Sequence, residues 1–155
     1  MNLELNQSAP DFTLFSTEKV EVTLSKLQGK NVVILFFPFA FTSVCTEELC
    51  NIRDNYHAYT GMDAEILAIS VDSVFTLDKW KNEMNYPFTM LSDFNKEVSQ
   101  LYNSYYDTFA FGSRGVSKRA AFVIDKSGIL KHMEILENAG EMPNLEAIKA
   151  CLSSL

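Results

Sequence analysis

The run Asn31-Val32-Val33-Ile34-Leu35-Phe36-Phe37 constrains the fold more than any other segment of this chain. After Asn31 it is apolar on both alternations and rich in β-branched and aromatic residues. A strand of this kind is typical of a parallel sheet that helices cover on both faces. With Pro38 interrupting the apolar residues that continue to Phe41, the run falls far short of the roughly 20 residues that cross a bilayer. We therefore predict a buried central strand.

A helix and a second buried strand are predicted to follow. Between Ser43 and Tyr59, apolar residues recur at intervals of four and three, which is the spacing of one helix face. These residues are Cys45, Leu49, Ile52, Tyr56 and Tyr59. Gly61 is predicted to end this helix, and the run 66–71 reads as another buried strand, which completes a βαβ unit.

The remaining segments predict a mixed sheet. We expect a β-hairpin around Ser16–Lys19, strands at 88–91, 120–124 and 129–135, and helices at 73–84, 96–102 and 144–152. The stretch 105–117 is expected to be irregular and aromatic. The predicted fold class is therefore α/β, with a sheet that is parallel in the middle and helices on both faces.

Composition and charge exclude several classes of protein. The 155 residues are 47% hydrophobic and 21% charged, and no linker or repeat interrupts them, so we predict one domain over residues 1–155. A net charge of −7 disfavours binding to nucleic acid or to an anionic membrane, because both require clustered Lys and Arg. The stretch Met1–Asn6 lacks the pattern of a secretory signal, so a cytoplasmic location is expected.

The chain contains three cysteines, an odd number that cannot all pair within one molecule. Three are also too few for a disulfide framework or a four-cysteine zinc site. The two histidines, His57 and His132, show no paired ligand spacing, so we expect no metal and no cofactor. Each cysteine is therefore free, redox-active or simply packed.

Cys45 has the position of a reactive cysteine. It falls in or near the first turn of the predicted helix, at the carboxyl end of the buried strand, where ligands bind in α/β folds. Unpaired N–H groups and the helix dipole favour negative charge there, and the thiolate is the nucleophilic form of cysteine. Because Cys45 also belongs to the apolar stripe, a packed core cysteine is the alternative.

The residues around Cys45 resemble a known family. Pro38-Phe39-Ala40-Phe41-Thr42-Ser43-Val44-Cys45 is similar to the peroxiredoxin signature of Pro, three residues, Thr, two residues and Cys. Further segments resemble the same family in order and spacing along nearly the whole chain. They are Ala9–Leu14, Leu67–Asp72, Pro87–Phe88, Leu91–Asp93 and Lys118–Asp125, the last of which contains Arg119.

This resemblance implies a thioredoxin-like fold with an added N-terminal hairpin, and a thiol-dependent peroxidase. Cys45 would attack a hydroperoxide and become a sulfenic acid. The Thr42 hydroxyl, Arg119 and the Cys45 N–H would stabilise the two peroxide oxygens, and Pro38 would shield the thiolate. Glu48, one turn beyond Cys45, resembles the acidic residue that orients this arginine, and an exposed helix glutamate is the alternative.

The sequence resembles two subgroups of the peroxiredoxins, which differ in how the sulfenic acid is resolved. Cys50 has the spacing of the bacterioferritin-comigratory (peroxiredoxin Q) group, in which that cysteine forms a disulfide. In an intact helix, however, Cα atoms five residues apart are separated by about 8–9 Å, which exceeds the limit of about 7 Å for a disulfide. A disulfide between Cys45 and Cys50 therefore requires the first turns of the helix to unwind. The sequence around Phe36–Thr42 and Ser92–Phe94 looks closer to the alkyl hydroperoxide reductase E group, often one-cysteine enzymes reduced by an external thiol. Cys151 is expected to be a packing residue, with an alternative role as resolver.

The expected partners are a hydroperoxide, thioredoxin or another thiol reductant, and a second copy of the chain in a homodimer. Two other functions compete. A thioredoxin-type disulfide oxidoreductase requires Cys-x-x-Cys, but Glu48 stands at that spacing from Cys45. A non-catalytic binding module of the same fold would not need Pro38, Thr42, Cys45 and Arg119 together.

Overall fold

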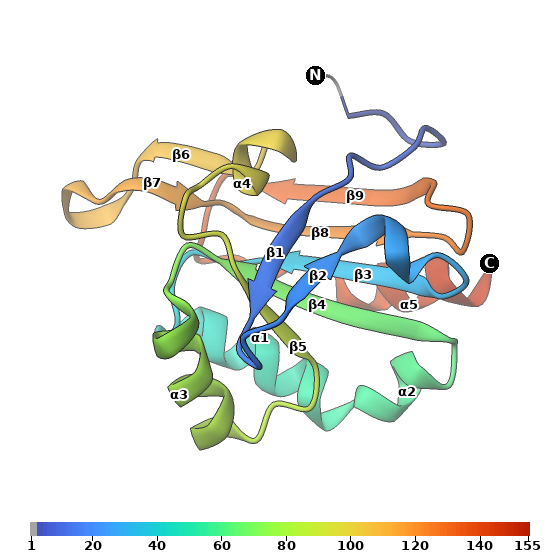
Figure 1. The fold of residues 1–155 in the computed structure, drawn as a ribbon, viewed down its shortest axis with the longest axis horizontal. Coiled ribbons are helices and arrows are strands. Elements are labelled where there is room, and N and C mark those ends of the chain that lie inside the picture. The colour runs from blue at the N-terminus through green and yellow to red at the C-terminus, as the bar shows by residue number, and fades with distance from the viewer. Residues whose placement is uncertain (1–2) are drawn as a thin grey trace.

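The computed structural model describes residues 3–155, so the first two residues of the stretch Met1–Asn6 lie outside the described part. The described chain forms a seven-stranded sheet in the order β2-β1-β5-β4-β3-β8-β9 (Figure 1). Strands β3, β4 and β5 are parallel, and the pairs on either side are antiparallel. The strands are β1 (Thr13–Ser16), β2 (Glu21–Thr23), β3 (Asn31–Phe36), β4 (Ala64–Ser70), β5 (Thr89–Ser92), β8 (Arg119–Ile124) and β9 (Leu130–Leu136).

Strand β3 is buried along its whole length, as its apolar run predicts. Its side chains alternate between two hydrophobic cores, with Val33 and Leu35 on one face and Ile34 and Phe36 on the other. Each core receives a different set of helices. This arrangement explains why neither alternation of the strand carries polar residues.

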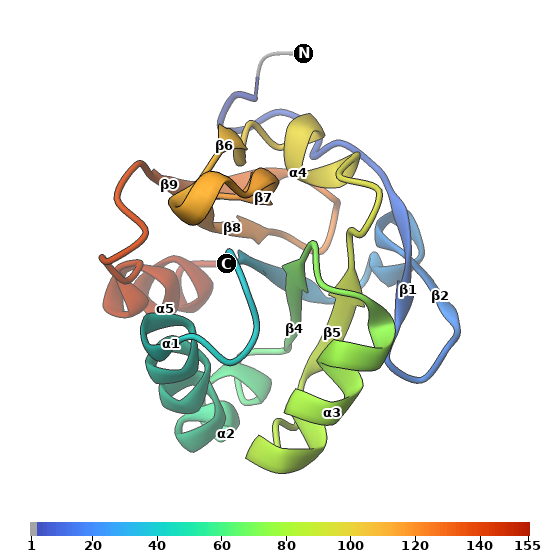
Figure 2. The same cartoon turned by 90° about the vertical axis from the view of Figure 1, so that its left-hand side faces the viewer.

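Helices cover both faces unequally (Figure 2). The core around Val33 and Leu35 is closed by α1 (Ser43–Asp54), α2 (Tyr56–Thr60), α3 (Val74–Met84) and α5 (Leu145–Ser153). The other core is closed by the short α4 (Val98–Leu101), the 3-10 turn η1 (Leu24–Leu27) and Phe12. No helix among residues 3–155 is long and apolar enough to span a membrane. The mixed sheet with its N-terminal hairpin agrees with the predicted fold class.

Two local predictions were wrong. The helix predicted over 43–59 is interrupted at Asn55, whose φ of −113° and ψ of 18° separate α1 from α2. The stretch predicted as irregular contains a second two-stranded sheet, β6 (Tyr105–Thr108) and β7 (Arg114–Ser117). Each of these strands has four residues, and Val116 is the large apolar side chain that they bury. An alternation this short gives too weak a signal to predict a strand.

Candidate active site

Cys45 is the third residue of α1 and is 1% exposed. Strand β3 ends at Phe36, and the segment 37–42 leads directly into the helix. The thiol therefore lies at the carboxyl edge of the central strand, within the helix turn whose N–H groups have no partner inside the helix. Both features place it where the sequence predicts a reactive cysteine.

Arg119 comes to Cys45 from a distant part of the chain. Strands β3 and β8 are antiparallel, with Phe36 opposite Ala120, so the beginning of β8 lies beside the end of β3. Arg119, the first residue of β8, is 2% exposed, and its Nη2 lies 3.2 Å from Cys45 Sγ. A guanidinium at this distance is a fixed positive charge that favours a thiolate.

Glu48 holds the guanidinium from the other side. It lies one turn beyond Cys45 on the same face of α1, is fully buried, and its Oε2 accepts from Arg119 Nη1 at 2.6 Å. The Ala139 carbonyl accepts from Arg119 Nε at 3.2 Å and Nη2 at 2.9 Å. These acceptors fix the plane of the guanidinium. The structure therefore places Glu48 beside the arginine and rules out the exposed position that was the alternative.

Burial sets the protonation of this pair. Burial raises the pKa of Glu48 to about 7, although the charge and hydrogen bond of Arg119 act in the opposite direction. For Arg119, burial acts to lower the pKa, but the neighbouring Glu48 and Cys45 outweigh it and the pKa is raised. The guanidinium thus stays charged, whereas the Glu48 carboxylate gains a proton as the pH falls through neutrality.

Pro38 and Thr42 line an open cavity of about 220 Å³ at Cys45. Its wall also includes Phe109, Arg119 and Ala139. The Thr42 hydroxyl donates to the Phe39 carbonyl at 2.8 Å, and no hydrogen bond joins it to Cys45 within residues 3–155. Its remaining lone pairs can accept a hydrogen bond from a molecule in the cavity. The four residues Pro38, Thr42, Cys45 and Arg119 are thus brought together as predicted.

Sequence patterns did not reveal how the loop before Cys45 is held. The Ala40 N–H donates to Asp72 Oδ2 at 2.8 Å, and Ser70 Oγ donates to the same oxygen at 2.6 Å. The next residue, Phe41, has a positive φ of 67°, which is unfavourable for a bulky side chain. Asp72 therefore secures a strained loop, and the neighbouring Ser73 caps α3.

Cys50 is held away from Cys45. Helix α1 is continuous through both residues, and each of the three cysteines is free. Cys50 is half-buried, and its Sγ lies 3.7 Å from the hydroxyl of Tyr86. Cys50 lies off the apolar stripe of α1, and the side chain of Tyr86 covers it.

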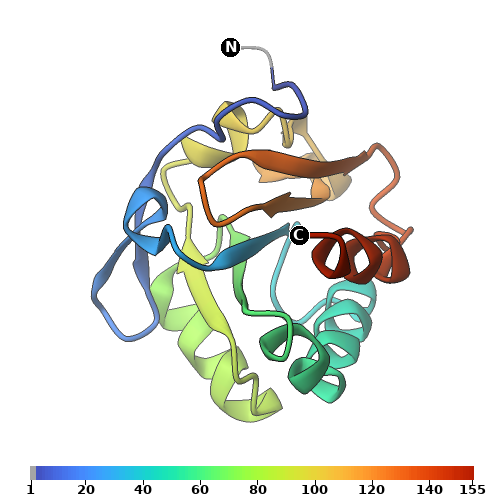
Figure 3. The same cartoon turned by 90° about the vertical axis from the view of Figure 1, so that its right-hand side faces the viewer.

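Cys151 lies at the opposite end of the sheet. It belongs to the last turns of α5, which is the red helix beside the sheet in Figure 3. Ser153, two residues further along this helix, contacts Met62 just before β4 begins. Because β3 and β4 are parallel, this end is the one farthest from the helix start that carries Cys45. Cys151 packs against the core, and burial raises the pKa of its thiol.

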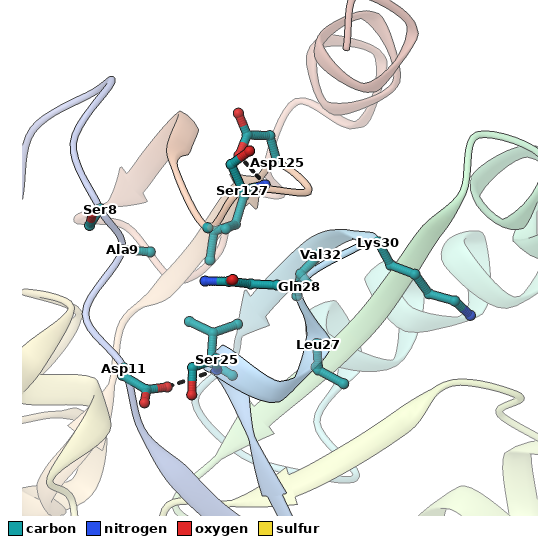
Figure 4. A pocket seen from close by; sticks show the side chains of 13 residues that line it. Ser8, Ala9, Asp11, Ser25, Leu27, Gln28, Lys30, Val32, Asp125 and Ser127 are labelled. Atoms are coloured by element: carbon teal, nitrogen blue, oxygen red, sulfur yellow. Dashed lines mark hydrogen bonds between the residues drawn. The ribbon is translucent and has the colours of Figure 1, made fainter.

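A second cavity, of about 170 Å³, lies between η1, the N-terminal segment and the β8–β9 turn (Figure 4). Val32 and Ile124 line it, which places it at the end of β3 away from Cys45. Its carboxylates are occupied by backbone groups, since Asp11 accepts from the N–H of Ser25 and Asp125 accepts from that of Ser127. Among the described residues, no cluster of His, Cys, Asp and Glu is arranged to hold a metal ion.

Comparison with known proteins agrees with this site. The sequence profile described as the AhpC/TSA family matches residues 5–133. The chain belongs to this family. It is therefore a peroxiredoxin, a thiol-dependent peroxidase with a thioredoxin-like fold.

Two relatives and one solved structure illustrate the similarity. The chain is 37% identical over 143 residues to alkyl hydroperoxide reductase E of Mycobacterium tuberculosis, with 90% of each chain covered. It is 34% identical over 131 residues to peroxiredoxin Bcp of Bacillus subtilis, with 84% of this chain and 83% of the relative covered. The fold matches that of peroxidoxin BcpB of Mycobacterium tuberculosis with a TM-score of 0.86 at 24% identity, over 99% of each chain.

Proposed function

We propose that Cys45 is the peroxidatic residue of this peroxiredoxin. Its thiolate attacks the terminal oxygen of a hydroperoxide, the O–O bond breaks, and the products are a Cys45 sulfenic acid and, after protonation, an alcohol or water. The observation that carries this proposal is the 3.2 Å contact between Arg119 Nη2 and Cys45 Sγ, in a buried site that opens on a cavity.

The other residues of the site have distinct roles in this proposal. Arg119 and the Cys45 N–H donate to the oxygens and stabilise the charge that develops there, and donors fixed before the reaction are the most effective. The Thr42 hydroxyl, whose hydrogen is donated to the Phe39 carbonyl, accepts a hydrogen bond from the hydroperoxide. Glu48 is a positioning residue that acts through Arg119. Pro38 lacks an N–H and covers the thiolate from the loop side.

Cys50 is proposed to resolve the sulfenic acid after the first turns of α1 unwind. The Cys50 sulfur attacks the Cys45 sulfur, a disulfide forms, and water leaves. Reduction of the sulfenic acid by an external thiol is the alternative, and the continuous helix between the two cysteines favours it. The mass of the oxidised protein separates the two routes. Only the first route gives a protein that is lighter by two hydrogens than the reduced chain, with the disulfide located between Cys45 and Cys50.

The proposed partners follow from this cycle. The substrate is hydrogen peroxide or an organic hydroperoxide, and thioredoxin or a related thiol protein reduces the oxidised enzyme. The cytoplasm suits the cycle, because thiol reductants are maintained there. We propose that residues 1–155 act as a single catalytic domain.

A homodimer through the active-site face is part of the proposal. Phe41 and Phe111 are 51% and 105% exposed on the segments that flank the Cys45 cavity, and exposed aromatics are frequent in interfaces. Light scattering of the chain and of Phe111→Ser tests this assignment. A monomer mass for the unmodified chain at micromolar concentration contradicts it.

Peroxide consumption with a thiol reductant tests the assignment of Cys45. Cys45→Ser is expected to abolish consumption. Cys151→Ser is the matched control, because it removes a thiol at the far end of the sheet, and it is expected to retain the full rate. Substantial consumption by Cys45→Ser contradicts the proposal.

A further inference from the structure

The contact between Cys50 and Tyr86 joins a residue that must move to one that is fixed. Tyr86 is 3% exposed, its ring packs edge-on against Trp80 at 5.2 Å, and it stacks on Phe88 at 5.1 Å. Cys50 lies on the helix segment that has to unwind before its sulfur can reach Cys45. Disulfide formation therefore requires the 3.7 Å contact between the Cys50 sulfur and the Tyr86 hydroxyl to break.

A second contact holds the end of α1 to the same segment. Arg53 Nη1 donates to the Met84 carbonyl at 2.7 Å, two residues before Tyr86. Unwinding from Ser43 through Cys50 leaves this contact intact. The helix can thus release its first two turns while its last turn stays attached. This release also separates Glu48 from Arg119, and the Tyr86 hydroxyl is the polar contact that the Cys50 side chain itself must leave.

The Tyr86 hydroxyl keeps its proton near neutral pH. Burial and the contact with Cys50 both raise the pKa of this phenol. A protonated phenol can donate to sulfur, whether the thiol of Cys50 is protonated or ionised. The contact therefore persists across the pH range in which the enzyme is assayed.

We propose that Tyr86 is a latch on Cys50, and that its hydroxyl sets how readily the helix releases this cysteine toward oxidised Cys45. The proposal rests on the proposed role of Cys50 as the resolving residue. When the latch opens, the Cys50 sulfur attacks the sulfenic sulfur of Cys45, the S–S bond forms, the S–O bond breaks, and hydroxide leaves as water with the thiol proton. Tyr86 has lost its contact by then, so it is a positioning residue.

Trp80 offers an intrinsic reporter of this release. It is the single tryptophan of the chain, and its ring contacts both Tyr86 and Phe41, at 5.2 and 5.9 Å. It therefore lies between the latch and the loop that leads into Cys45. Unwinding of α1 is expected to change its fluorescence in the same phase in which the disulfide appears.

Comparison of Tyr86→Phe with Tyr59→Phe tests the latch. Both variants remove one hydroxyl from a buried ring of the same core, but the Tyr59 hydroxyl has no partner within residues 3–155. Each protein receives one equivalent of hydrogen peroxide without reductant. Samples are quenched over time, and mass spectrometry measures the sulfenic acid and the Cys45–Cys50 disulfide.

The expected result is a change in the ratio of the two rates. Loss of one hydrogen bond is expected to raise the rate of disulfide formation, relative to the rate of Cys45 oxidation, by roughly two- to tenfold in Tyr86→Phe. Tyr59→Phe is expected to leave the ratio unchanged. With excess peroxide, Tyr86→Phe should also accumulate less Cys45 sulfinic acid, because the sulfenic acid is removed sooner.

Two outcomes overturn the latch, and they are distinguishable. If the unmodified chain forms the disulfide but Tyr86→Phe forms it at the same or a lower relative rate, the latch is wrong and Cys50 remains the resolving residue. If the unmodified chain consumes peroxide without forming any Cys45–Cys50 disulfide, the resolving role of Cys50 and the latch both fall.

Discussion

Glu48 Oε2 lies 2.6 Å from Arg119 Nη1, and neither side chain is more than 2% exposed. The same guanidinium contacts Cys45 Sγ through Nη2. The carboxylate therefore acts on the thiol through a shared arginine. Such a pair is costly to break, because removal of one partner leaves the other charged and buried.

Glu48→Gln is expected to slow oxidation of Cys45 by about fivefold near pH 8, because a charge-assisted hydrogen bond to Arg119 becomes a neutral one. Stopped-flow measurement of the second-order rate with hydrogen peroxide checks this. Glu47→Gln is the matched control, since the neighbouring Glu47 is exposed. Equal rates for Glu48→Gln and the unmodified chain would exclude a positioning role.

Arg119→Lys is expected to lower the same rate by about two orders of magnitude, because lysine keeps the charge but cannot bind Glu48, Ala139 and Cys45 together. Arg114→Lys serves as the control, because Arg114 is exposed. A loss of less than about threefold in Arg119→Lys would mean that charge alone suffices.

Stability is expected to depend on pH through Glu48. Its pKa is about 7 in the folded chain and 4.5 for an unperturbed glutamate, so the folded state binds the proton more tightly. The stabilisation from this proton is fully present below pH 4.5 and is lost as the pH rises through 7. Urea unfolding at pH 5.5 and 8 should show a fall of about 2 kcal/mol for this group.

The same two-pH measurement on Glu48→Gln isolates this contribution, because glutamine does not titrate. The variant is expected to lose less stability than the unmodified chain between pH 5.5 and 8. Identical pH profiles for the two proteins would show that Glu48 is ionised throughout this range and would contradict the direction of the shift.

Asp72→Ala is expected to lower peroxidase activity by about tenfold, because it frees the Ala40 N–H and releases the loop in which Phe41 has a positive φ. Loss of its hydrogen bonds to Ala40 and Ser70 should also cost about 1–3 kcal/mol in the free energy of unfolding. Steady-state kinetics and urea unfolding check the two effects. Asp107→Ala, at an exposed position, should change neither.

Local sequence patterns predicted the elements with strong periodicity. The strand of Val33 and Phe36, the helix start at Cys45 and the return strand all depend on side-chain spacing within a few residues. The break at Asn55 and the β6–β7 hairpin were missed. At these places tertiary packing outweighs a weak local signal, since short strands bury few side chains.

The sequence by itself determined that Cys45 stands at a helix start after a buried strand, and that Glu48 shares its helix face. Only the tertiary structure decided what this face meets. The antiparallel pairing of β3 with β8 brings Arg119 against Cys45, which is 74 residues away in the chain. The Ala139 carbonyl also accepts hydrogen bonds from the Arg119 guanidinium, and no side-chain pattern predicts a contact from a backbone group. The same packing covers Cys50 with Tyr86. Burial and charge depend on neighbours that are distant in the chain, so local spacing cannot specify them.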